Sequence, residues 1–174
     1  MLKTLGLAVV VIVVAVLAYA ALQPDTFRVT RSATIDAPPD KVYPLIADFH
    51  RWPAWSPWEN RDPAMQRTFG GADRGKGATY AWAGNREVGE GRMEITDATM
   101  PSKVTIKLDF LQPFEGHDVT VFDLVPQGSA TQVTWTMYGP ATFLTKLMDV
   151  FFSMDRMIGK DFEAGLEKMK TAAK

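Results

Sequence analysis

Few side chains of this chain are suited to acid–base or nucleophilic chemistry. It contains two histidines, His50 and His117, and no cysteine. Glu59 and Asp109 could also act as an acid or a base, but no spacing pairs any of these four residues. Charged side chains mostly lie on protein surfaces, and the G-x-S-x-G pattern of a serine nucleophile does not occur. We therefore leave the catalytic residues unassigned and interpret these four as surface residues.

Metal and nucleotide sites also lack a complete pattern. Two distant histidines without cysteine give no zinc ligand set, so we expect no metal and no cofactor. Residues 70–77 (GGADRGKG) come close to the phosphate loop G-x-x-x-x-G-K-[ST], but Gly77 stands where a hydroxyl would bind magnesium. The following residues, 78–83, are typical of a strand, whereas the phosphate loop needs a helix there. A glycine-rich hairpin loop is the better interpretation.

Large apolar side chains are more numerous than one small core needs, and methionines are frequent among them. Aromatic rings and pliable thioethers are suited to the wall of a cavity that accepts an apolar ligand. The alternative is ordinary core packing. We take as candidate ligand-binding residues Trp52, Trp55, Trp58, Tyr80, Trp82, Met93, Ile106, Phe110, Phe122, Trp135, Met137, Met148, Phe151, Met154 and Met157.

Three of the five tryptophans fall within residues 52–58, together with Pro53 and Pro57. The prolines exclude a regular α-helix, so the rings lie on a rigid irregular segment. We expect this segment to form part of a cavity rim, with at least one tryptophan facing a C-terminal helix near residues 151–157. The alternative is that the tryptophans anchor short helices to the sheet as core.

The rest of the chain must position these residues, and its periodicities are clear. Residues 142–170 alternate apolar and charged positions in steps of three and four, which predicts one long amphipathic helix. Asp40 is a plausible N-cap for a short helix that ends near Phe49. Alternation with period two predicts antiparallel strands with one apolar face at residues 27–36, 65–69, 78–83, 87–98, 103–110, 116–125 and 131–138.

Residues 5–22 carry no charge and would reach roughly 27 Å as a helix, close to the ~30 Å hydrocarbon core of a bilayer. We interpret residues 1–23 as a single-pass transmembrane anchor and residues 24–174 as one globular domain. Basic residues flank the run on both sides, at Lys3 and Arg28, so the side of the membrane that the domain faces stays open.

The alternative for this segment is a cleaved signal peptide. Lys3 would then be its basic residue, and Ala18-Tyr19-Ala20 would be a small-x-small cleavage site. The apolar run is longer than the core of most signal peptides, which favours the anchor. A formal charge of −1, with basic and acidic residues intermixed, argues against nucleic acid as a partner, and we expect a monomer.

Four segments resemble the SRPBCC superfamily, in particular its polyketide cyclase/dehydrase-like (START-like) branch. They are residues 27–59 (FRVTRSATIDAPPDKVYPLIADFHRWPAWSPWE), 85–96, 133–137 and 154–162. The resemblance extends over about residues 27–170. It implies an α+β helix-grip fold: a seven-stranded antiparallel sheet curved around a long C-terminal helix, with two short helices after the first strand and a deep apolar cavity.

The function that follows is a membrane-anchored module that binds a hydrophobic small molecule or lipid in that cavity. One alternative is an enzyme of cyclase or dehydratase type that uses the same cavity, and the sequence leaves open whether the protein is an enzyme. The other is a cochaperone-like interaction domain, which would have a filled cavity and an exposed apolar patch. The resemblance covers many activities, so it does not choose among these.

Overall fold

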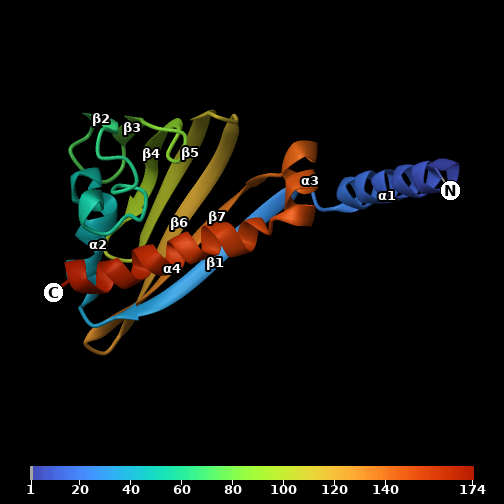
Figure 1. The fold of residues 1–174 in the computed structure, drawn as a ribbon. Coiled ribbons are helices and arrows are strands. Elements are labelled where there is room, and N and C mark those ends of the chain that lie inside the picture. The colour runs from blue at the N-terminus through green and yellow to red at the C-terminus, as the bar shows by residue number, and fades with distance from the viewer. Residues whose placement is uncertain (1) are drawn as a thin grey trace.

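A curved antiparallel sheet wraps around a C-terminal helix, with a separate N-terminal helix projecting from one end (Figure 1). The structure is a computed structural model that describes residues 2–174; the side chains of residues 1–3, including the Lys3 of a possible signal peptide, lie outside the described part. The sheet has seven strands in the order β1-β7-β6-β5-β4-β3-β2. The predicted α+β helix-grip fold is confirmed.

All seven predicted strands form, and each pairs antiparallel with its neighbours. Four extend at least two residues further at one end than predicted. The start of β4 is three residues later than predicted, because the Asn85 side chain accepts hydrogen bonds from the backbone N–H groups of Glu87 and Val88 and holds them in a turn. The strands are β1 (Thr26–Ile35), β2 (Gln66–Gly71), β3 (Ala78–Ala83), β4 (Glu90–Thr99), β5 (Lys103–Gln112), β6 (Gly116–Gln127) and β7 (Ala130–Pro140).

The two short helices after β1 are α2 (Pro39–Ala47) and the 3-10 helix η1 (Phe49–Ala54). Asp40 is not the N-cap that we predicted: Pro38 occupies that position and Asp40 lies in the first turn. Pro39 fits the first helical position because its missing N–H would have no partner there. Asp48 caps η1 instead, since its carboxylate accepts a hydrogen bond from the backbone N–H of His50 at 2.9 Å.

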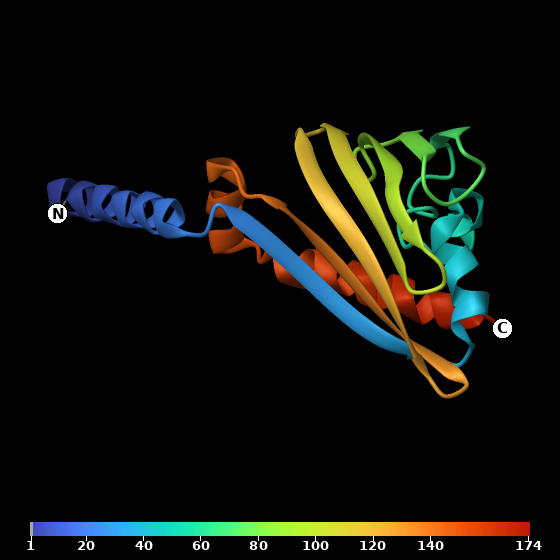
Figure 2. The same cartoon turned by 180° about the vertical axis from the view of Figure 1, so that it is seen from behind.

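The predicted single helix over residues 142–170 is wrong. Two helices form, α3 (Phe143–Phe151) and α4 (Met154–Ala172), with an extended Phe152 between them. Asp149 accepts a hydrogen bond from the backbone N–H of Met154 at 2.6 Å, and Ser153 accepts one from that of Arg156 at 3.3 Å. These caps start a new helix, so α3 turns away from the sheet while α4 runs along β1 (Figure 2).

The N-terminal helix α1 (Leu2–Leu22) extends away from the sheet, with nearly all its described side chains exposed. Its segment Thr4–Leu22 is long and apolar enough to span a membrane, and only 6% of the most apolar window is buried. A signal sequence or the core helix of a soluble protein can have the same length and composition, but this domain does not bury α1.

An ion-pair cluster fixes α4 on β1. The guanidinium of Arg31 crosses the helix at Gly159 and reaches Asp155 on one side, at 2.9 Å, and Glu163 on the other, at 2.7 Å. A Cβ at residue 159 would collide with that guanidinium, so glycine leaves the space that the arginine fills. Both acidic groups are exposed, which means that the cluster sets position more than it adds stability.

Substitution of Gly91 in β4 tests how tightly the sheet is packed. A Cβ there would overlap the indole ring of Trp82 and lie 2.7 Å from the carbonyl oxygen of Asp109. We predict that Gly91→Ala lowers the free energy of unfolding by about 1–3 kcal/mol, since overpacking displaces a ring and a backbone. Gly116→Ala is the matched control, because its nearest atom, in Phe110, is 3.6 Å away. Equal urea-denaturation midpoints for the two variants would contradict this packing.

The buried Asp118 on β6 should make the free energy of unfolding depend on pH. It is only 7% exposed on the same face as Thr120, and burial raises its pKa to about 6. Because the folded-state pKa lies above the ordinary value of 3.8, the folded protein loses stability as pH rises from about 4 to 6 and the carboxylate ionises. We predict that Asp118→Asn raises the free energy of unfolding by about 1–3 kcal/mol at pH 8 and changes it little at pH 4. Asp123→Asn, on the other face of the strand, should not reproduce this pH dependence.

Candidate ligand-binding cavity

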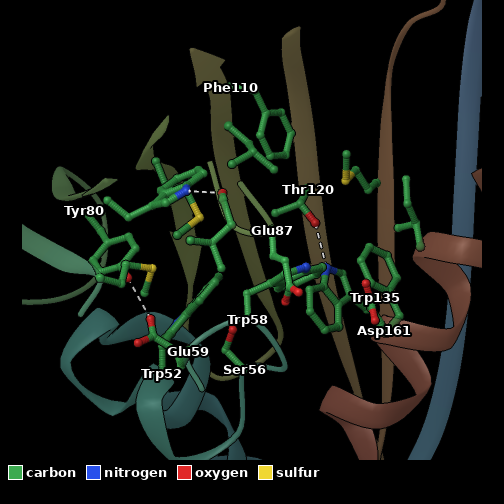
Figure 3. Close-up of a pocket in the computed structure, with 18 residues that line it drawn as sticks. Trp52, Ser56, Trp58, Glu59, Tyr80, Glu87, Phe110, Thr120, Trp135 and Asp161 are labelled. Carbon is green, nitrogen blue, oxygen red and sulfur yellow. Dashed lines mark hydrogen bonds between the residues drawn. The ribbon is translucent and has the colours of Figure 1, made fainter. Parts of the chain in front are cut away.

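A cavity of about 220 Å³ lies between the inner face of the sheet, the segment around η1 and helix α4 (Figure 3). It arises because α4 packs along β1, at one edge of the sheet, while η1 packs against β3 near the other edge. Helix α2 covers part of the inner surface between these two supports, where it contacts β5, β6 and β7, and the cavity lies over another part of it. Aromatic and methionine side chains form most of the wall, as the composition predicts.

The structure brings eight predicted residues to this cavity. They come from the η1 segment and from strands β3, β4, β5 and β7, which explains why they are scattered through the sequence. These residues are Trp52, Trp58, Tyr80, Trp82, Met93, Phe110, Trp135 and Met137.

Trp135 and Phe162 join the sheet to α4 at one side of the cavity. Their rings stack with centroids 3.9 Å apart and an angle of 6° between planes. The indole N–H of Trp135 donates to the hydroxyl of Thr120 at 2.8 Å, and Thr120 donates to the backbone carbonyl of Thr136. The polar edge of the indole is therefore satisfied inside the wall.

The tryptophan-rich segment is divided between cavity and core. Trp52 and Trp58 line the cavity, whereas Trp55 is 0% exposed and donates its indole N–H to the carbonyl of Leu45 on α2 at 2.7 Å. Trp58 meets α4 at Phe162, at 6.3 Å between ring centroids, and not near residues 151–157 as predicted. The rim interpretation thus fits Trp52 and Trp58, and the core alternative describes Trp55.

Glu59 is the buried carboxylate of the wall, so its interpretation as a surface residue is wrong: it is 5% exposed. One carboxylate oxygen accepts from the Tyr80 hydroxyl at 2.7 Å, and the other accepts from Nε of Arg67 at 2.7 Å. Arg67 also donates to the Glu59 backbone carbonyl. Burial, and then the bond to Glu59, raise the pKa of Tyr80, so this phenol stays protonated as a donor.

Two further carboxylates reach the cavity. Asp161 on α4 forms an ion pair with Arg61, and Glu87 extends into the cavity from the turn between β3 and β4 (Figure 3). Among residues 2–174, no hydrogen bond or ion pair engages the Glu87 carboxylate. The described residues contain no group of three or more histidine, cysteine, aspartate or glutamate side chains placed to hold a metal ion.

Asp109 and His117 do form a pair, but they lie on the outer face of the sheet. Nδ1 of His117 lies 2.8 Å from the Asp109 carboxylate, which also contacts Arg92 and Lys107. The bond to His117 lowers the pKa of Asp109 to about 2. The Asp109 side chain is buried, so its interpretation as a surface residue is wrong, whereas His117 is half exposed. Neither residue reaches the cavity.

Seven predicted residues do not line the cavity, and two physical reasons account for them. Trp55, Ile106 and Phe122 are fully buried core, where other side chains already fill the space around them. The helix break at Phe152 turns α3 away from the sheet, and Arg31 holds the start of α4 at the edge strand β1, outside the cavity. The residues displaced by it are Met148, Phe151, Met154 and Met157, three of them exposed and Met154 half-buried.

The sequence interpretation missed ten lining residues. Leu108 alternates with Ile106 and Phe110 on the inner face of β5, so strand periodicity could have identified it. The periodicity of the C-terminal helix likewise places Ile158 and Phe162 on its apolar face. No sequence signal distinguishes the others, because loops and strand pairing bring them in: Ser56, Glu59, Met65, Glu87, Val88, Thr120 and Asp161.

Comparison with solved structures agrees with this fold. A Chromobacterium violaceum protein superposes with a TM-score of 0.59 at 15% identity, covering 87% of this chain and 98% of its own. A Staphylococcus aureus protein of unknown function gives 0.61 at 16% identity, with coverages of 85% and 93%. A Mycobacterium smegmatis protein gives 0.57 at 18% identity, with coverages of 86% and 92%. Identities this low show a shared fold alone.

Comparison of the amino-acid sequence with known families is more specific than the likeness of folds. No curated protein matches the chain significantly. Residues 26–174, the whole of the domain that follows α1 and its linker, match the family described as polyketide cyclase / dehydrase and lipid transport. The chain therefore belongs to that family.

Proposed function

We propose that this domain binds a hydrophobic small molecule, or the hydrophobic part of a lipid, in the cavity, and that α1 anchors it to a membrane. The observation that carries the proposal is the chemistry of the wall. Aromatic rings and the thioethers of Met65, Met93 and Met137 dominate it, and two of its polar pairs, Tyr80 with Glu59 and Trp135 with Thr120, are already hydrogen-bonded. A wall of this kind favours apolar surface and can adjust to different guests.

The size of the cavity narrows the class of ligand. About 220 Å³ is below the ~300–1,000 Å³ typical of sites for drug-sized molecules. The site therefore suits a compact apolar or aromatic molecule, or one segment of a longer lipid. A longer ligand would have to displace methionine side chains or leave part of itself outside.

An enzyme of cyclase or dehydratase type is the alternative, favoured by the three carboxylates that line the cavity. A general base needs a lone pair directed at the substrate. Both oxygens of Glu59 accept hydrogen bonds from protein groups, and Asp161 is paired with Arg61. Glu87 is the carboxylate best placed for such chemistry, but it lies on an exposed turn. The open cavity also argues against a cochaperone-like domain with a filled interior.

Membrane anchoring is supported by the composition and exposure of α1. Its apolar side chains face outward along the whole described helix, which would be costly in water. An anchored binding domain would stay beside the phase into which apolar ligands partition.

Substitutions of Trp58 and Trp55 can distinguish an effect on ligand binding from an effect on stability. With the domain from residue 24 onward, we predict that Trp58→Ala weakens binding of the apolar fluorophore N-phenyl-1-naphthylamine about tenfold, the effect of losing roughly 1.4 kcal/mol of aromatic contact. Trp55→Phe should leave that affinity unchanged and lower the free energy of unfolding by about 1–3 kcal/mol, because the carbonyl of Leu45 loses its donor. If wild type binds neither the fluorophore nor any lipid extracted with it, the proposal is wrong.

The ligand that copurifies with the protein can be used to test whether the protein is an enzyme. Mass spectrometry of organic extracts from the purified full chain should identify it, and incubation with fresh protein should return it unchanged if the domain only binds. Glu87→Gln should then retain wild-type affinity within about twofold, since it removes a charge and no apolar contact. Conversion of the ligand by wild type that is lost in Glu87→Gln would instead establish the enzyme.

A further inference from the structure

Helix α3 exposes an apolar face that the domain itself does not cover. Leu144, Met148 and Phe151 follow one another at spacings of four and three, so they share one side of the helix. Their exposed fractions are 50%, 41% and 65%. Phe143 and Phe152 at the ends of α3 are also at least half exposed. Single exposed apolar residues are ordinary, but a contiguous face of this kind marks an interaction site.

The opposite side of α3 is fixed to the linker that follows α1. Lys146 is buried and its ammonium forms an ion pair with the carboxylate of Asp25, whose pKa it lowers. The backbone N–H of Ala141 donates to the carbonyl of Asp25 at 2.8 Å. Asp25 is three residues beyond Leu22, a distance of at most about 11 Å along an extended chain. Helix α3 is therefore held close to the end of the apolar span.

Helix α3 is also in contact with α1, and Ala20 in the last turn of α1 is fully buried. Figure 2 shows α3 between the end of α1 and the sheet. In a bilayer, the headgroup layer on each side is roughly 5–8 Å thick, so a helix within about 11 Å of the span lies in or against that layer.

We propose that α3 is an interfacial helix that inserts Leu144, Met148 and Phe151 into the lipid surface beside the exit of α1. This inference rests on the proposed anchoring by α1 but concerns a different surface. Nearby, the guanidinium of Arg28 lies 5.0 Å from the centre of the Tyr138 ring, across the β1–β7 pair. Arginine and tyrosine are typical of the membrane–water interface, where a charged or polar tip meets headgroups.

Attachment to the bilayer through both α1 and α3 would fix the orientation of the domain, which attachment through α1 alone would not. Three linker residues after α1 could let the domain rotate, whereas contact through α3 fixes one orientation of the sheet and its cavity relative to the bilayer. A second copy of the chain or a protein partner could also cover the apolar face, but neither would follow from the position of α3 beside the end of α1.

The chain contains no cysteine, so single labelling sites can be introduced without background. We would label Phe151→Cys, Val13→Cys and Ser129→Cys of the full chain with the fluorophore NBD. Phe151 and Ser129 are exposed, and Ser129 lies in the β6–β7 turn at the far end of the sheet. Each protein is placed, one copy per disc, in nanodiscs of phosphatidylcholine and phosphatidylglycerol, with and without lipids that carry a nitroxide quencher in the upper acyl chain.

The proposal predicts blue-shifted emission at residue 151 and loss of at least about half of it on quenching, as for other residues buried at the interface. Residue 13 should report the bilayer interior, and residue 129 should be unaffected. If the lipid quencher reaches the fluorophore at residue 13 but not the one at residue 151, the inference about α3 is overturned and anchoring by α1 is kept. If the fluorophore at residue 13 does not lie in lipid, both the inference about α3 and the proposed anchoring by α1 are overturned. Blue-shifted emission at residue 151 that lipid quenchers do not reach would show a protein partner and also overturn it.

Discussion

The whole structure depends on one packing constraint: a curved seven-stranded sheet must cover its inner face with one long helix, α4, and two short ones, α2 and η1. Helix α4 can approach closely only where small residues allow it. At Gly165 a Cβ would lie 3.0 Å from the Trp135 ring and 3.1 Å from Pro57, so the helix rests directly on that ring. Having packed there and along β1, it cannot also fill the space beneath β3 and β4, and that unfilled space is the cavity.

The cavity wall illustrates how buried polar groups limit function. Unpaired, the Glu59 carboxylate would cost several kcal/mol, and the hydrogen bonds from Tyr80 and Arg67 offset that cost. The same bonds use one acceptor site on each carboxylate oxygen and hold the group between Tyr80 and Arg67. The carboxylate is therefore a fixed part of the wall, and this arrangement is one reason why we propose binding ahead of catalysis.

The fold could be predicted from the sequence because it depends on repeated signals. Most strands of the sheet repeat an apolar face every second residue, although β2 does not. The site was predictable where a residue shares such a face, as Met93 and Phe110 do, or belongs to the tryptophan-rich segment, as Trp52 and Trp58 do. Glu59 and Glu87 reach the cavity through irregular segments, whose paths depend on hydrogen bonds such as those of Asn85 that no periodicity reveals.

The misassigned C-terminal helix shows where periodicity fails, and its cause is local. The apolar stripe continues through residues 148–157 with helical spacing, yet Asp149 and Ser153 cap the backbone there and redirect the chain. Lys146 is buried and paired with the exposed Asp25 instead of facing water, and this ion pair positions the redirected α3 beside the linker. One short polar sequence thus removes four side chains from the cavity and presents an apolar helix beside α1. An uninterrupted helix would have kept these side chains on the apolar stripe of α4 and left no separate apolar helix in contact with α1.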